Sequence, residues 1–157
     1  TSEGADYETF KATLAEICTG LSQRIASDGE GATKFLTVHV MGTKSFADAK
    51  TIAMSVAKSP LVKTAFFGED PNWGRVICAV GYAGVPMNPE TTVVKFGGIP
   101  VYVHGVGADY DETALKQVMG EHDIVVDIDM GIGTQEATVW TCDFSYEYVK
   151  INGEYHT

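Results

Sequence analysis

Residues 28–40 read DGEGATKFLTVHV, and the hydrophobic period of the chain changes within them. Before this stretch, one apolar face recurs at steps of three and four and predicts a helix over about 6–26, with Phe10, Leu14, Ile17, Leu21 and Ile25 on that face. After the glycine-rich break, residues 35–40 favour a strand whose side chains alternate between two faces. Ser45 occupies an N-cap position before a second amphipathic helix, so the predicted order is helix, strand, helix.

The rest of the chain continues this mixture of helices and strands. The patterns predict a short apolar strand at 60–67, a buried helix at 76–80 ending at Gly81, a hairpin of 93–96 and 99–103 around Gly97-Gly98, a helix at 111–119, strands at 124–128 and 137–142, and a helix-like segment at 144–151. With no repeat and no evident linker, we expect one domain over 1–157. The predicted fold class is α/β (α+β mixed).

Composition narrows the classes of function. The chain has 157 residues, of which 45% are apolar, and a formal net charge of −10. That charge repels phosphate backbones and anionic lipid, so we expect neither a nucleic-acid nor a membrane partner. The apolar runs are far shorter than the roughly 20 residues that cross a bilayer, and no leader opens the sequence. Three widely spaced cysteines suggest no disulfide framework and fit a reducing compartment.

Three polar, glycine-flanked stretches interrupt the packable patterns: 29–34, 68–75 and 152–157. Glu30 lies between two glycines, where a carboxylate could approach an amine of a ligand; spacing alone favours a solvated turn after a helix. In the second stretch Arg75 could bind a substrate carboxylate, with Glu69 or Asp70 orienting it. A purely structural turn, with Trp73 packed on the core and Arg75 in an internal ion pair, explains that stretch equally well.

Other kinds of site find little support. The glycine pairs at 29–31 and 131–133 lack the third glycine of a dinucleotide fingerprint, and no phosphate loop occurs. The four histidines have no metal-ligand spacing, and one on a strand, such as His39, is expected to be partly buried and hydrogen-bonded. Asp127 and Asp129 alternate on one strand and could bind a cation, but edge-strand carboxylates facing water explain them as well. We predict no metal site.

Four motifs, in order along nearly the whole chain, carry a specific resemblance. Residues 28–35 (DGEGATKF), 59–65 (SPLVKTA), 67–75 (FGEDPNWGR) and 148–155 (YVKINGEY) closely resemble motifs of the bifunctional ornithine acetyltransferase and N-acetylglutamate synthase family of arginine biosynthesis. The resemblance implies an α/β sandwich with a mixed sheet. It places the sequence in the C-terminal portion of the β chain of a precursor that cleaves itself.

The resemblance also implies the chemistry. Members of that family cut themselves before a threonine, which becomes the N-terminal nucleophile, takes the acetyl group from N-acetylornithine and passes it to glutamate. Oxyanion donors come from the α chain. Thr1 opens a polar, acidic lead into a helix and lies too close to Gly29-Glu30-Gly31, so we expect the nucleophile upstream and no catalytic residue in this chain.

Substrate binding carries over residue by residue. Glu30 matches the family's substrate-contacting glutamate, while Asn152 and Thr157 match the asparagine and threonine that close the site. An amine-bearing substrate suits the carboxylate, and an amino-acid carboxylate suits the two hydrogen-bonding side chains. The turn with Asp70, Asn72 and Arg75 could support the site without touching substrate.

Cofactors and partners follow from the same resemblance. No cofactor is implied, although acetyl-CoA could serve as acetyl donor in the synthase reaction. The implied partners are the α chain and the N-terminal β segment, in an α2β2 heterotetramer of the cytoplasm, or of the mitochondrion in a eukaryote. Two alternatives stay open: a family member with altered amino-acid specificity, and a non-catalytic fragment that contributes only surface to a partner.

Overall fold

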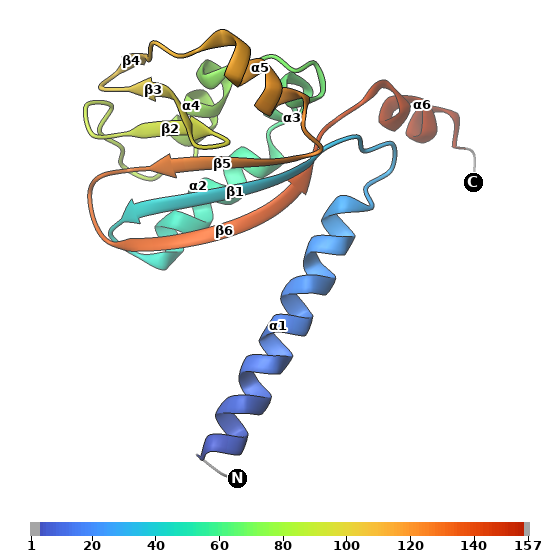
Figure 1. The fold of residues 1–157 in the computed structure, drawn as a ribbon, viewed down its shortest axis with the longest axis vertical. Helices are drawn as coiled ribbons and strands as arrows, with labels where there is room; N and C mark the ends of the chain where they lie inside the picture. Colours follow the sequence, from blue (N-terminus) through green and yellow to red (C-terminus); the bar gives the residue numbers. More distant parts are fainter. Residues whose placement is uncertain (1–3, 156–157) are drawn as a thin grey trace.

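The computed structural model describes residues 4–155 (Figure 1). The elements are α1 Ala5–Ser27, β1 Phe35–Thr43, α2 Phe46–Lys58, α3 Pro60–Phe67, α4 Trp73–Gly81, β2 Val93–Phe96, β3 Ile99–Val103, β4 Val106–Gly107, α5 Glu112–Gly120, β5 Asp123–Asp129, β6 Gln135–Cys142 and α6 Tyr146–Glu154. Helices and strands are mixed along the chain, so the predicted fold class is confirmed.

Six strands form one mixed sheet in the order β4-β3-β2-β5-β1-β6. β1 pairs with β5 in parallel, and the other pairings are antiparallel. The predicted hairpin consists of β2 and β3, and both residues of its turn have the positive φ that glycine tolerates, 54° at Gly97 and 83° at Gly98. The two-residue strand β4 was not predicted.

The hydrophobic core fills one face of this sheet. There α2 packs on β1 and β6, with α4 beside it. Alternate residues of β1 and β5 point into this layer and are at most 2% exposed: Leu36, Val38, Val40, Ile124, Val126 and Ile128. Burial of each such side chain contributes roughly 1.5–3 kcal/mol, so β1 and β5 form a rigid base for the loops at their ends.

The segment 60–67 is a helix, so the prediction of a short strand there is wrong. The Ser59 side chain accepts a hydrogen bond from the Val62 N–H, and Pro60 lies in the first turn, where its missing N–H costs nothing. Val62 and Phe66, four residues apart, are both buried. A short apolar run suits a strand and a buried helix alike, and here the cap and the proline favour the helix.

The opposite face of the sheet carries polar side chains. His39 of β1 contacts Asp127 of β5, with 3.1 Å between Nδ1 and Oδ1, and Glu136 of β6, with 3.3 Å between Nε2 and Oε2. The prediction of a partly buried, hydrogen-bonded His39 is confirmed. The prediction that Asp127 and Asp129 lie on an edge strand is wrong, because β5 runs between β2 and β1.

The first helix, α1, extends away from the sheet and buries none of its residues (Figure 1). Its predicted apolar face is exposed, at 66% for Phe10, 48% for Leu14, 55% for Ile17, 53% for Leu21 and 77% for Ile25. A contiguous apolar stripe of this kind is typical of a surface that meets another protein segment. Among residues 4–155, no helix has the length and apolar character that a membrane span requires.

Candidate functional site

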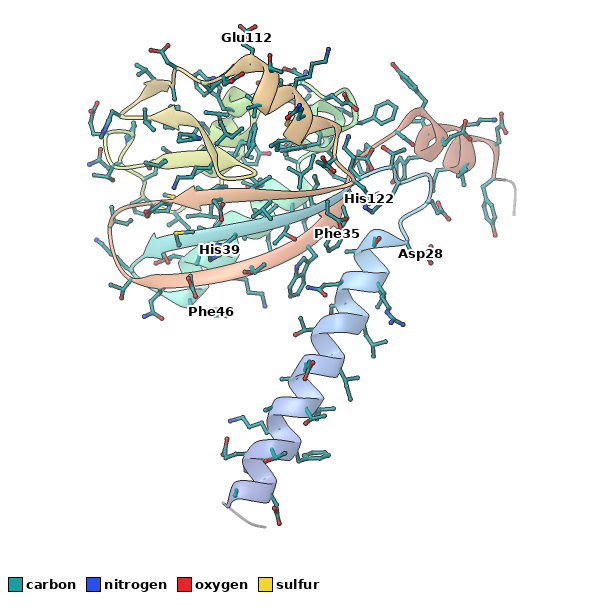
Figure 2. All side chains as sticks on the ribbon, viewed as in Figure 1. Asp28, Phe35, His39, Phe46, Glu112 and His122 are labelled. Carbon is teal, nitrogen blue, oxygen red and sulfur yellow. The ribbon has the colours of Figure 1, made fainter. Side chains whose placement is uncertain are left out.

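Glu30 lies on the loop 28–34, which joins the exposed helix α1 to the core strand β1. Asp28 and Phe35 mark the two ends of this loop in Figure 2, and His122 is near Phe35. The Phe35 N–H donates to the His122 carbonyl at 2.8 Å. The loop is therefore at the end of the sheet where β1 and β5 begin and β6 ends.

Close packing requires both glycines that flank Glu30. A Cβ atom at Gly29 would lie 2.6 Å from the Cys142 Sγ. Gly31 has a φ of +67°, and a Cβ there would lie 2.8 Å from the Tyr148 backbone nitrogen. These contacts bring the loop directly against the end of β6 and the first turn of α6.

The first turn of α6 is fixed to this loop by Ser145. Its hydroxyl donates to the Gly31 carbonyl and accepts from the Tyr148 N–H at 3.4 Å, so one side chain both caps the helix and binds the loop. Phe144 stacks on Tyr148 at 4.4 Å between ring centroids, and the Lys63 Nζ of α3 lies 4.0 Å from the Phe144 centroid. These contacts hold α6 in place although none of its residues is buried.

Glu30 and Asn152 meet at this junction. The Asn152 Nδ2 donates to the Glu30 Oε2 at 2.9 Å and to the Tyr148 carbonyl at 2.9 Å. Both side chains are exposed. The carboxylate keeps lone pairs for an ammonium group, while the asparagine amide holds it in position. Thr157, the third predicted substrate-binding residue, and Thr1 lie outside the described residues.

Lys34 anchors the loop to the C-terminal end of α5. It is 6% exposed, and its Nζ donates to the Met119 carbonyl at 2.8 Å and the Glu121 carbonyl at 3.2 Å, at the C-terminal end of α5. A longer ion pair of 3.4 Å joins it to Glu69, which itself has a φ of +54°. Three acceptors thus satisfy a buried ammonium group.

We expect Lys34→Met to lower the free energy of unfolding by about 2–3 kcal/mol, because it leaves two carbonyls and a carboxylate without their donor. Urea unfolding of the 157-residue chain measures the change. Lys150→Met is the matched control: Lys150 is exposed, and its one ion pair in the part of the chain that the structure describes is with Glu147 at 3.7 Å, so its loss should cost less than about 0.5 kcal/mol. Equal effects of the two variants would contradict the anchoring role.

The side chains of Asn72 and Arg75, in and after the turn before α4, hydrogen-bond to that turn and to α3 and not to Glu30 or Asn152. Asn72 caps α4 by accepting from the Arg75 N–H at 3.1 Å and donates its amide to Asp70 at 3.0 Å. The Arg75 guanidinium donates to the Leu61 carbonyl at 2.9 Å and to the Thr64 hydroxyl at 3.3 Å. Among residues 4–155, Arg75 forms no ion pair, so neither the suggested pairing with Glu69 or Asp70 nor the alternative of an internal ion pair is seen there. Trp73 packs against the core, as the structural interpretation predicted.

Comparisons with known proteins identify the family of this chain. The model of the ArgJ family matches residues 1–157. The chain belongs to the ArgJ family. It is 45% identical to the mitochondrial arginine biosynthesis bifunctional protein ArgJ of Schizosaccharomyces japonicus, covering 96% of this chain and 36% of that protein, and 43% identical to the ArgJ of Bacillus cereus, covering 99% and 38%. The chain thus spans little more than a third of the length of these curated relatives.

A crystal structure of ArgJ from Bacillus halodurans has the same fold. It superposes with a TM-score of 0.93 at 36% identity, covering 99% of this chain and 73% of that one. The family resemblance inferred from four motifs is confirmed. In this ArgJ-family chain the first and last motifs, around Glu30 and Asn152, lie in contact, and the motif of residues 67–75 contacts the loop through the ion pair of Glu69 with Lys34.

Two residues of this ArgJ-family chain that hold the site together were not predicted. Asp143 binds the loop at Thr33 and Lys34, and Ser145 binds it at Gly31. Ser145 carried a usable signal, because serine before an amphipathic run marks an N-cap. Asp143 carried none, since its partners lie 109 and 110 residues away in the sequence. Among residues 4–155, no group of three or more histidine, cysteine or carboxylate side chains could hold a metal ion.

Proposed function

We propose that this chain supplies substrate-binding residues to an enzyme that transfers an acetyl group from N-acetylornithine to glutamate in arginine biosynthesis. The observation that carries the proposal is the contact between Glu30 and Asn152, which joins the first and last family motifs into one exposed polar site. Glu30 holds an amine of the ornithine moiety, and Asn152 and Thr157 hydrogen-bond an amino-acid carboxylate. Asp70, Asn72 and Arg75 support the neighbouring turn without touching substrate.

The chemistry then proceeds on a threonine outside this chain. Its hydroxyl oxygen attacks the acetyl carbonyl, the C–N bond breaks, and ornithine leaves with the proton on its amine. The glutamate amine next attacks the acetyl-threonine ester, the C–O bond breaks, and the hydroxyl regains its proton. Donors from the α chain stabilise both tetrahedral intermediates. No cofactor takes part, and acetyl-CoA replaces N-acetylornithine as donor where the synthase reaction also occurs.

The partners proposed for this chain are the remaining segments of its own precursor. The α chain and the N-terminal β segment would cover the apolar stripe of α1, in an α2β2 assembly. The exposure of Phe10, Ile17 and Ile25 supports this, because a stripe left open to water would favour aggregation. Nucleic acid and membranes are not proposed as partners, given the net charge of −10. The compartment is the cytoplasm in a bacterium or the mitochondrion in a eukaryote.

We expect the 157-residue chain alone to self-associate through α1, and the double substitution Leu14→Asp and Leu21→Asp to make it monomeric. Sedimentation velocity at several concentrations measures this. Ala12→Asp with Thr19→Asp adds the same charge to the opposite side of α1 and should leave association unchanged. A wild-type chain that stays monomeric at high concentration would argue against a covered stripe.

The decisive experiment is intact-mass and N-terminal analysis of the complete purified protein, followed by an assay of acetyl transfer from N-acetylornithine to glutamate. We expect an α chain, a β chain with an N-terminal threonine upstream of residue 1, and activity. Acetylation of Thr1 in an active preparation would place the nucleophile elsewhere than proposed. A complete, correctly cleaved protein without transfer activity would refute the proposed function.

A further inference from the structure

Asp143 is a buried carboxylate that the proposed chemistry does not use. It lies between β6 and α6 and is 2% exposed, and within the described residues 4–155 it accepts hydrogen bonds only from the loop that carries Glu30. Its Oδ1 accepts from the Thr33 N–H at 2.8 Å and the Lys34 N–H at 3.0 Å, and its Oδ2 accepts from the Thr33 hydroxyl at 2.6 Å. A buried carboxylate needs several donors, and here every donor belongs to one short loop.

The contact between the two segments is reciprocal. The Asp143 N–H donates to the Lys34 carbonyl at 3.2 Å, and two residues further on Ser145 donates to the Gly31 carbonyl. Asp143 and Ser145 therefore bind the loop at three residues, Gly31, Thr33 and Lys34. Because Ser145 is also the N-cap of α6, the same short segment sets where α6 begins relative to the loop.

We infer that Asp143 is a positioning residue, which fixes the Glu30 carboxylate against Asn152 through the backbone of Thr33 and Lys34. Glu30 is exposed and has no burial of its own to hold its backbone. Asn152 lies two helical turns beyond the Ser145 cap, so both members of the pair depend on the segment that Asp143 opens. The inference rests on the proposed role of Glu30 in binding substrate.

The test uses the complete enzyme and compares three variants. Asp143→Ala should raise KM for N-acetylornithine about 10-fold while kcat changes less than about 3-fold, because a displaced binding group weakens ground-state contacts. Asp143→Asn retains one oxygen that can accept from both backbone N–H groups, so it should restore KM to within about 3-fold of wild type. Ile52→Ala, in the fully buried core of α2, serves as the control for lost stability and should leave KM unchanged.

Hydrogen exchange provides a readout that does not depend on activity. In Asp143→Ala the amides of Thr33 and Lys34 should lose protection, and the side-chain amide signals of Asn152 should shift. If Asp143→Ala does not fold, Thr33→Val decides the question: it removes only the hydroxyl bond and should raise KM about 3-fold, with Thr33→Ser restoring it.

Two results would overturn the inference: an unchanged KM despite lost amide protection, or an equal rise of KM in Ile52→Ala. Failure of the proposed function looks different. In that case the wild-type enzyme transfers no acetyl group, while the exchange and amide signals still report whether Asp143 orders the loop.

Discussion

In the complete enzyme, replacing Glu30 with alanine should raise KM for N-acetylornithine about 30-fold and change kcat little. A hydrogen bond between charged groups contributes about 1.5–3 kcal/mol, and each 1.4 kcal/mol corresponds to a factor of about ten in binding. Glu30→Gln separates charge from shape, since its amide oxygen can still accept from the Asn152 Nδ2 that lies 2.9 Å from the Glu30 carboxylate. We expect the glutamine variant to show most of the same loss. Steady-state kinetics at varied N-acetylornithine measures both.

Glu147→Ala is the control for this prediction. Glu147 is a neighbouring exposed carboxylate on α6, and its ion pair is with Lys150 and not with the site. Glu147→Ala changes the local charge by the same amount as Glu30→Ala. It should leave KM within about 2-fold of wild type, because exposed charges interact weakly in water. If Glu30→Ala has kinetics indistinguishable from those of Glu147→Ala, Glu30 does not bind the substrate.

Gly31→Ala should lower the free energy of unfolding by about 2 kcal/mol or more and also impair substrate binding. The φ of +67° disfavours any side chain, and the new Cβ would lie 2.8 Å from the Tyr148 nitrogen and 2.9 Å from the Glu147 Cβ. Relief of this clash requires α6 to move away from the loop, which separates Asn152 from Glu30. Urea unfolding and KM for N-acetylornithine together report the two consequences.

Gly84→Ala separates the cost of backbone strain from the cost of the steric clash. Gly84 has a similar φ of +77°, but a Cβ there would meet nothing within 4 Å. It should cost only about 1 kcal/mol, from the backbone conformation alone, and leave KM unchanged. Equal losses of stability in the two variants would show that α6 does not press on Gly31.

Much of the fold could be predicted from the sequence, because in most segments the hydrophobic period and the positions of the chain-breaking residues indicate the same element. The helix α1, the strands β1, β5 and β6, and the hairpin around Gly97-Gly98 all lie where the patterns predict them. The strand predicted at 60–67 is wrong because eight mostly apolar residues carry no decisive period, whereas Ser59 and Pro60 are typical of a helix start. The order of strands in the sheet was not accessible, so the internal position of Asp127 and Asp129 was missed.

The prediction of the candidate site depended on the family resemblance more than the prediction of the fold did. Spacing alone favoured a solvated turn for Glu30, and a polar run such as residues 152–157 usually frays. The contact between Glu30 and Asn152 spans 122 positions, and the contacts of Asp143 span nearly as many. No local sequence pattern predicts a contact between residues so far apart in the sequence. Only the three-dimensional arrangement of β1 beside β6 brings these segments together.

That arrangement also has a consequence for the order of events on the ribosome. Asp143, Ser145 and Asn152 are added more than a hundred residues after Glu30. Until Asp143 is added, the amides of Thr33 and Lys34 lack its carboxylate as acceptor, so a chain released before Asp143 has the loop of Glu30 without these hydrogen bonds. Since synthesis adds only about 5–20 residues per second, the nascent protein spends seconds in this state. Chains terminated before Asn152 should therefore lack the contact between Glu30 and Asn152 on which the proposed substrate binding depends.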